Sequence, residues 1–90
     1  MNKAELIDAV AVTTGQSKGD AGAAVEAVFD HIKNAMRRGD TVSLVGFGSF
    51  SVSDRAARTG RNPRTGQQID IPASRAPKFK AGKQLKDAVN

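Results

Sequence analysis

The apolar and polar residues alternate at helical spacing in the first part of the chain. A first helix is predicted after Asn2, an N-cap residue type followed three positions later by Glu5, which can close a capping box. Its apolar stripe consists of Leu6, Ile7, Val10 and Ala11. Gly15 is typical of the residue after a helix. The pattern therefore predicts one amphipathic helix ending before Gly15.

A second, longer helix is predicted after Ser17, which can act as its N-cap with Asp20 as the partner in a capping box. Its broad apolar face consists of Ala21, Ala24, Val25, Val28, Phe29, Ile32, Ala35 and Met36. Arg37 and Arg38 occupy the expected last turn, where cations interact favourably with the helix dipole, and Gly39 ends the helix. We expect these two helices to serve packing rather than chemistry.

The period then changes to two, which indicates strands. In "TVSLVGFGSFSV" (41–52), Val42 and Leu44 share one face, and apolar residues alternate with serines again from Phe50. The glycines of Gly46-Phe47-Gly48 give the backbone freedom at a turn, so we predict a hairpin or a sharply bent strand pair. A dinucleotide-binding fingerprint is excluded, because position 51 is serine and a strand follows where a helix is required.

Residues 53–75 have little to bury, since Ile69 and Ile71 are their only large aliphatic side chains. Five arginines and no lysine occur in the segment, and "TGRNPRTG" (59–66) is a strong turn signal. A disordered loop fits this composition, but the alternation of Ile69 and Ile71 favours two strands that run out and back as a protruding ribbon. Ala56-Ala57 and Pro72 are expected to mark a bulge or bend.

The carboxyl-terminal stretch "PKFKAGKQLKDAVN" (77–90) supplies Phe79 to the core and predicts a short helix that opens near Gly82 or Lys83. Lys80, Lys83 and Lys86 are three residues apart. A solvated face is the ordinary explanation of such a row, but its position after an arginine-rich segment favours a phosphate-binding surface.

Composition and charge narrow the class of protein. The chain has 90 residues, no cysteine, tryptophan or tyrosine, and a net charge of +5. Residues 1–40 carry five basic against six acidic side chains, whereas residues 41–90 carry nine against three, so all the excess positive charge lies in the second half. This asymmetry is typical of polyanion binders. A core this thin, without disulfides, predicts oligomerisation. Because no signal peptide or membrane span is visible, we expect a soluble, cytoplasmic protein.

Three motifs resemble the HU family of bacterial nucleoid DNA-binding proteins, which includes the related integration host factors: "GFGSF" (46–50), "GRNPRTG" (60–66) and "PKFKAGKQLKDAV" (77–89). The similarity runs from Met1 to Asn90 without apparent insertion. It implies an α+β fold in an intertwined dimer, with two N-terminal helices, a three-stranded antiparallel sheet extended into a β-ribbon arm, and a short C-terminal helix. It also implies one domain, with a dimer body (1–52 and 76–90) and an arm (53–75).

The resemblance further implies a DNA-binding surface and a wedge. The wedge is Pro63, and the remaining DNA-binding positions are Lys3, Arg55, Arg58, Arg61, Asn62, Arg64, Arg75, Lys80, Lys83 and Lys86. The expected dimer core is Phe29, Ile32, Leu44, Phe47, Phe50 and Phe79. No cofactor or metal is expected. Many family members carry a basic residue at the arm root, where this chain has Ser53 and Asp54, so the local contacts there are open.

The residues themselves suit such a wedge. Proline lacks an N–H and fixes φ, so Pro63 can enter between bases without burying an unpaired donor. Arginine is less strongly hydrated than lysine and suits the negative potential of the minor groove. Since that groove separates base pairs poorly, we expect little sequence preference, strong salt dependence, and tighter binding to nicked, gapped or already bent duplexes. The expected partners are double-stranded DNA in the bacterial nucleoid and a second chain, identical or a paralogue.

Other functional classes fit less well. An enzyme would have to use His31, the only histidine, which we expect to be a partly buried helix residue. An RNA-binding protein remains an alternative, because arginine-rich arms also bind RNA. A protein-docking strand is disfavoured by five like charges.

Overall fold

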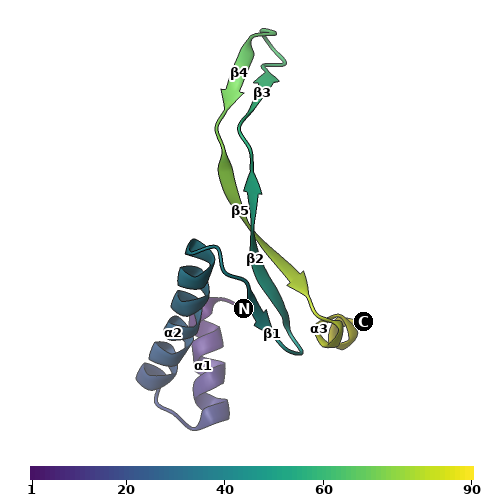
Figure 1. The fold of residues 1–90 in the computed structure, drawn as a ribbon. Coiled ribbons are helices and arrows are strands. Elements are labelled where there is room, and N and C mark those ends of the chain that lie inside the picture. The colour runs from purple at the N-terminus through teal and green to yellow at the C-terminus, as the bar shows by residue number, and fades with distance from the viewer. The chain divides into compact units, whose positions relative to one another are not determined.

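The computed structural model describes all residues from Met1 to Asn90, and it confirms the predicted helix-plus-antiparallel-sheet fold with three helices and five strands (Figure 1). The chain divides into two compact units, residues 1–35 and residues 36–90. The boundary falls within the second helix, so that its last two residues, Met36 and Arg37, belong to the second unit.

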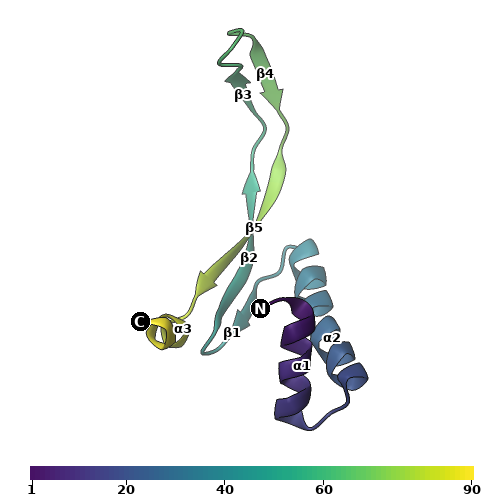
Figure 2. The same cartoon turned by 180° about the vertical axis from the view of Figure 1, so that it is seen from behind.

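The first unit is a helical hairpin in which α1 (Lys3–Thr14) lies beside α2 (Lys18–Arg37), as both views show (Figures 1 and 2). Asn2 caps α1, with its Oδ1 accepting a hydrogen bond from Glu5 N at 2.8 Å, and Ser17 Oγ accepts one from Asp20 N at 3.1 Å. Gly15 closes α1 with φ of 72°. These three predicted boundaries are therefore confirmed.

The core of the helical hairpin is small. Its buried side chains are Ala11, Ala21 and Val25. Gly22 of α2 faces Ile7 of α1, since a Cβ there would lie 3.7 Å from Ile7 Cγ2, an ordinary van der Waals distance. The predicted apolar face of α2 is only partly covered within the chain, since Val28 and Phe29 stay exposed.

The second unit is built on an antiparallel sheet of strand order β1-β2-β5: β1 (Val42–Leu44), β2 (Gly48–Arg55) and β5 (Ser74–Ala81). The predicted hairpin between β1 and β2 is confirmed, and Gly46 takes φ of 85° at its turn. Gly48 is required where β2 meets β5, because a Cβ there would lie 2.5 Å from the Lys80 carbonyl oxygen.

The predicted ribbon is also confirmed, as β3 (Arg58–Arg61) paired antiparallel with β4 (Gln68–Ile71). The β2–β5 ladder ends at the pair Arg55–Ser74, and the β3–β4 ladder begins at Arg58–Ile71. The break between them falls at Ala56-Ala57 and Pro72-Ala73, where the sequence predicted a bulge or bend. Helix α3 (Lys83–Val89) follows β5 with Gly82 as its N-cap, as predicted.

Candidate nucleic-acid interface

The tip of the β3–β4 ribbon is a tightly bonded turn that presents Pro63. Asn62 organises it: its N–H donates to Gln67 O at 2.8 Å, its carbonyl accepts from Gly66 N at 2.8 Å, and its Oδ1 accepts from Arg64 N at 2.9 Å. Gly66 takes φ of 71°, a conformation that favours glycine. Pro63 itself is exposed. The turn therefore holds a rigid apolar ring in solvent, and Asn62, a predicted DNA contact, has a clear role in shaping it.

Four of the five arm arginines have free guanidinium groups. Arg55, at the end of β2, and Arg58 and Arg61, on β3, are exposed, as is Arg64 in the turn. Their side chains make no hydrogen bond or ion pair within the chain. Because no carboxylate neutralises them, these cations are available to an anionic partner.

The sheet carries a second polar surface that continues toward the arm. Ser49, Ser51 and Arg55 alternate along β2 with the apolar Phe50 and Val52, so they share the opposite face. On β5, Lys80 is the register partner of Ser49, and Lys78 is the partner of Ser51. Hydroxyl and ammonium donors thus lie side by side, and both types bind phosphate oxygens.

The sequence prediction included Lys80 but missed Lys78. The missing signal was available in the stretch Lys78-Phe79-Lys80, because a strand that turns Phe79 inward must place both lysines on the opposite face. Lys78 is exposed and has no acidic partner.

The remaining predicted lysines differ in their surroundings. Lys83 and Lys86 lie exposed on α3, whose start is fixed by a hydrogen bond of 2.8 Å from Gly82 N to Phe47 O. Neither has an acidic partner. Lys3, on α1, instead forms an ion pair with Glu26 on α2. Lys3 would have to exchange this partner for a phosphate in order to bind DNA.

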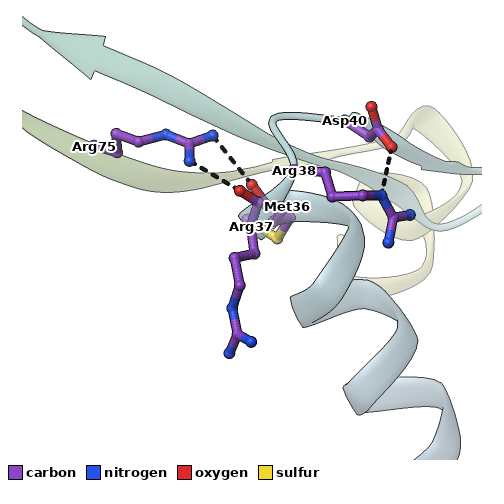
Figure 3. Close-up of polar contacts among 5 residues, drawn as sticks. All are labelled: Met36, Arg37, Arg38, Asp40 and Arg75. Atoms are coloured by element: carbon purple, nitrogen blue, oxygen red, sulfur yellow. Dashed lines mark hydrogen bonds and ion pairs between the residues drawn. The ribbon is translucent and has the colours of Figure 1, made fainter.

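Among the predicted DNA-binding residues, Arg75 has the surroundings that fit this role least (Figure 3). Its Nη1 donates to the carbonyl oxygen of Arg37 at 3.0 Å, and its Nη2 donates to that of Met36 at 3.3 Å. Its Nε lies 3.6 Å from Asp54 Oδ1. Every nitrogen of this guanidinium group therefore already faces an acceptor within the chain.

The predicted dimer-core residues are only partly covered by their own chain. The rings of Phe50 and Phe79 lie 4.8 Å apart and those of Phe47 and Phe79 lie 5.6 Å apart, both tilted as aromatic pairs prefer. Yet Phe47 is 46% exposed and Phe79 is 45% exposed. Phe29 and Leu44 are also exposed, whereas Ile32 and Phe50 are intermediate.

Three further features bear on other classes of function: the single histidine, clusters of metal-ligand side chains, and helices able to span a membrane. His31 is exposed on α2, so the expectation of partial burial was wrong. The structure contains no group of three or more His, Cys, Asp or Glu side chains able to hold a metal ion. None of its helices has the length and apolar character needed to span a membrane.

Comparison with known proteins identifies the family that the whole chain matches. The family model for bacterial DNA-binding proteins matches residues 1–90. The protein named DNA-binding protein HU from Geobacillus stearothermophilus is 64% identical over 89 residues, covering 99% of both chains. DNA-binding protein HU from Staphylococcus aureus (strain COL) is 60% identical over the same length and coverage.

Solved structures agree with the sequence relatives. An HU–DNA cocrystal structure from Anabaena matches with a TM-score of 0.88 and 48% identity, over 99% of this chain and 97% of that one. HU from Thermotoga maritima matches with a TM-score of 0.71 and 34% identity over the whole of both chains. A whole-chain family match and relatives at 60% and 64% identity confirm what the three motifs indicated: this chain belongs to the HU family of bacterial DNA-binding proteins.

Proposed function

We propose that this protein is an architectural DNA-binding protein that enters the minor groove, bends the duplex by inserting Pro63, and organises bacterial nucleoid DNA with little sequence specificity. HU proteins are themselves standard examples of minor-groove architectural binding. The observation that carries the proposal for this chain is the arm tip, where an exposed proline is held by a bonded turn and flanked by Arg61 and Arg64.

The energetics require both the wedge and the cations. Unstacking a base step costs about a few kcal/mol and bending the duplex costs of order 1–10 kcal/mol. Contacts along a bent path must offset these costs. The unpaired arm arginines and the lysines of the sheet and α3 supply them, because each cation that neutralises a phosphate releases counterions. A nicked or gapped duplex has part of its stacking already lost, so it binds more tightly.

The active species in this proposal is a dimer, formed by two copies or by this chain and a close paralogue. A chain whose only buried hydrophobic side chains are Ala11, Ala21 and Val25 leaves too much apolar surface for a stable monomer. The half-exposed aromatic cluster of Phe47, Phe50 and Phe79 is a surface that a second copy of the same chain can cover. Two arms, one per chain, can then hold the duplex from both sides.

The wedge is tested with Pro63→Ala and, as a matched control, Gln67→Ala in the same turn. Gln67 is exposed and its side chain makes no hydrogen bond. Energy transfer between dyes at the two ends of a short duplex reports the bend. We expect Pro63→Ala to lose bending with a smaller loss of affinity, whereas Gln67→Ala keeps both. Equal bending by Pro63→Ala and the parent protein contradicts the wedge.

The phosphate contribution is tested by titrating intact duplex, nicked duplex and structured RNA at several salt concentrations. The logarithm of the affinity constant falls with that of the salt concentration by about 0.9 for each B-DNA phosphate contacted. We expect a steep slope on DNA and preference for the nicked duplex. Equal affinity at low and high salt contradicts electrostatic binding, and a preference for RNA over both duplexes contradicts the DNA role.

A further inference from the structure

Arg75 makes one connection that the DNA-binding role of the family motifs does not explain. It lies near the start of β5, yet its guanidinium group reaches the carbonyl oxygens of Met36 and Arg37, at the carboxyl end of α2 (Figure 3). These two carbonyls are among the last four of the helix, which have no partner within it. Arg75 therefore bonds across 38 and 39 residues of sequence to two carbonyls that have no partner within the helix.

The chemistry of the contact selects arginine. The carboxyl end of a helix carries partial negative charge, so a cation there is stabilised. A planar guanidinium group can donate to two acceptors at once from fixed directions, whereas the single ammonium group of lysine is a point charge. Asp54, the register partner of Arg75 on β2, faces the third nitrogen, Nε, at 3.6 Å. One side chain thus joins both strands of the ribbon root to the end of α2.

The turn after α2 is shaped to admit this side chain. Gly39 takes φ of 84°, and its N–H donates to the Met36 carbonyl at 2.9 Å, the same carbonyl that accepts from Arg75. A Cβ at position 39 would lie 3.2 Å from Arg75 Nη2, which is tighter than ordinary van der Waals contact. The positive φ favours glycine at position 39, and a side chain there would also push the guanidinium group aside by a few tenths of an ångström.

We propose that Arg75 is a positioning residue that sets the direction in which the arm leaves the carboxyl end of α2, and that it does not itself contact DNA. The proposal rests on the DNA-bending function above, because a fixed arm direction matters only if the arm must meet a duplex. Such positioning would raise DNA affinity through entropy. An arm held at its root before binding loses less conformational freedom when it enters the groove. Asp54 then has a role as well, since it lies beside Arg75 Nε and helps to orient that side chain.

The test compares Arg75→Gln and Arg75→Lys with the matched pair Arg58→Gln and Arg58→Lys. Arg58 is exposed on β3 and has no partner within the chain. For both Arg75 variants we expect a loss of affinity of about two- to fivefold, the range of a cation at a helix carboxyl end. We also expect weaker bending and an unchanged salt slope. Arg58→Gln should instead lower the salt slope by about 0.9, and Arg58→Lys should restore it. A slope that falls in Arg75→Gln and recovers in Arg75→Lys overturns the proposal.

A measurement without DNA separates this proposal from the proposed function. Because the chain has no cysteine, spin labels can be placed at Arg37→Cys and Arg55→Cys alone. Arg55 is exposed at the end of β2, on the same side of the break in the ribbon ladder as Arg75. Labelled chains are diluted with unlabelled ones, so that the measured distance lies within one chain. We expect the distance distribution to broaden in Arg75→Gln and Arg75→Lys and to stay narrow in Arg58→Gln. An unchanged distribution in the Arg75 variants overturns the positioning role, even if the parent protein bends DNA as proposed. A broadened one supports it even if the parent does not.

Discussion

Replacing Phe79 by alanine tests whether the aromatic cluster is a dimer core. Within its own chain the residue is 45% exposed, so the covered half contributes about 1–1.5 kcal/mol of burial. Its two tilted ring pairs, with Phe47 and Phe50, add roughly 0.5–1.5 kcal/mol each. The free energy of unfolding should therefore fall by about 2–4.5 kcal/mol if the chain acts alone. If a second copy covers the ring, the loss approaches the roughly 3–5 kcal/mol of a buried phenylalanine in each chain, and a dimer loses it twice.

The assay is thermal unfolding followed by circular dichroism at two protein concentrations a hundredfold apart. For a dimer that unfolds to two free chains, each tenfold dilution lowers the free energy of unfolding by about 1.4 kcal/mol. For each kcal/mol of unfolding free energy lost on dilution, the Tm of the parent protein should fall by about 2–4 °C, the range for a folded unit with the combined length of two chains. Phe79→Ala should show a much lower Tm at both concentrations.

Ile69→Ala is the matched control. Ile69 is 44% exposed, almost the same as Phe79, but it lies on β4 in the ribbon, away from the aromatic cluster. Its replacement should change the Tm little. A parent Tm that does not depend on concentration, with the mass of a single chain by light scattering, would refute the reasoning from exposed aromatic area.

Two further predictions concern the lysines. Lys78→Ala should lower the salt slope by about 0.9 without changing the Tm, because it removes one unpaired cation from the polar face of β2 and β5. As a control, Lys33→Ala on α2 should leave the slope unchanged in the same titration. Glu26→Gln should raise DNA affinity severalfold at low salt and steepen the salt slope, because it releases Lys3 from its ion pair. An unaltered titration curve would show that Lys3 does not contact phosphates.

The element boundaries were predictable because they depend on local chemistry. Asn2 and Ser17 act as caps through hydrogen bonds to residues three positions away, so a short stretch of sequence contains all the partners. Gly15 and Gly39 end their helices with positive φ for the same local reason. The ribbon was predictable from the alternation of Ile69 and Ile71 around a strong turn signal.

The contacts that the sequence did not indicate join residues that are far apart along the chain. The contacts of Arg75 join residues 38 and 39 positions apart, and no periodicity reports such a contact. The ion pair between Lys3 and Glu26 joins two helices in the same way. Lys78 was missed for a different reason. Lys80, Lys83 and Lys86 share a spacing of three, whereas Lys78 belongs to a strand and follows a period of two.

The interruption of the ribbon ladder has a mechanical consequence. Both strands lose their pairing at the same level, at residues 56–57 and 72–73, and no backbone hydrogen bond crosses between them there. A bulge in one strand would fix a bend in one direction, whereas a gap on both sides leaves two strands without ladder hydrogen bonds, which resist bending less than the paired segments on either side. If the arm enters DNA as proposed, this unpaired level lets its outer part follow duplexes of different curvature without remodelling the tip.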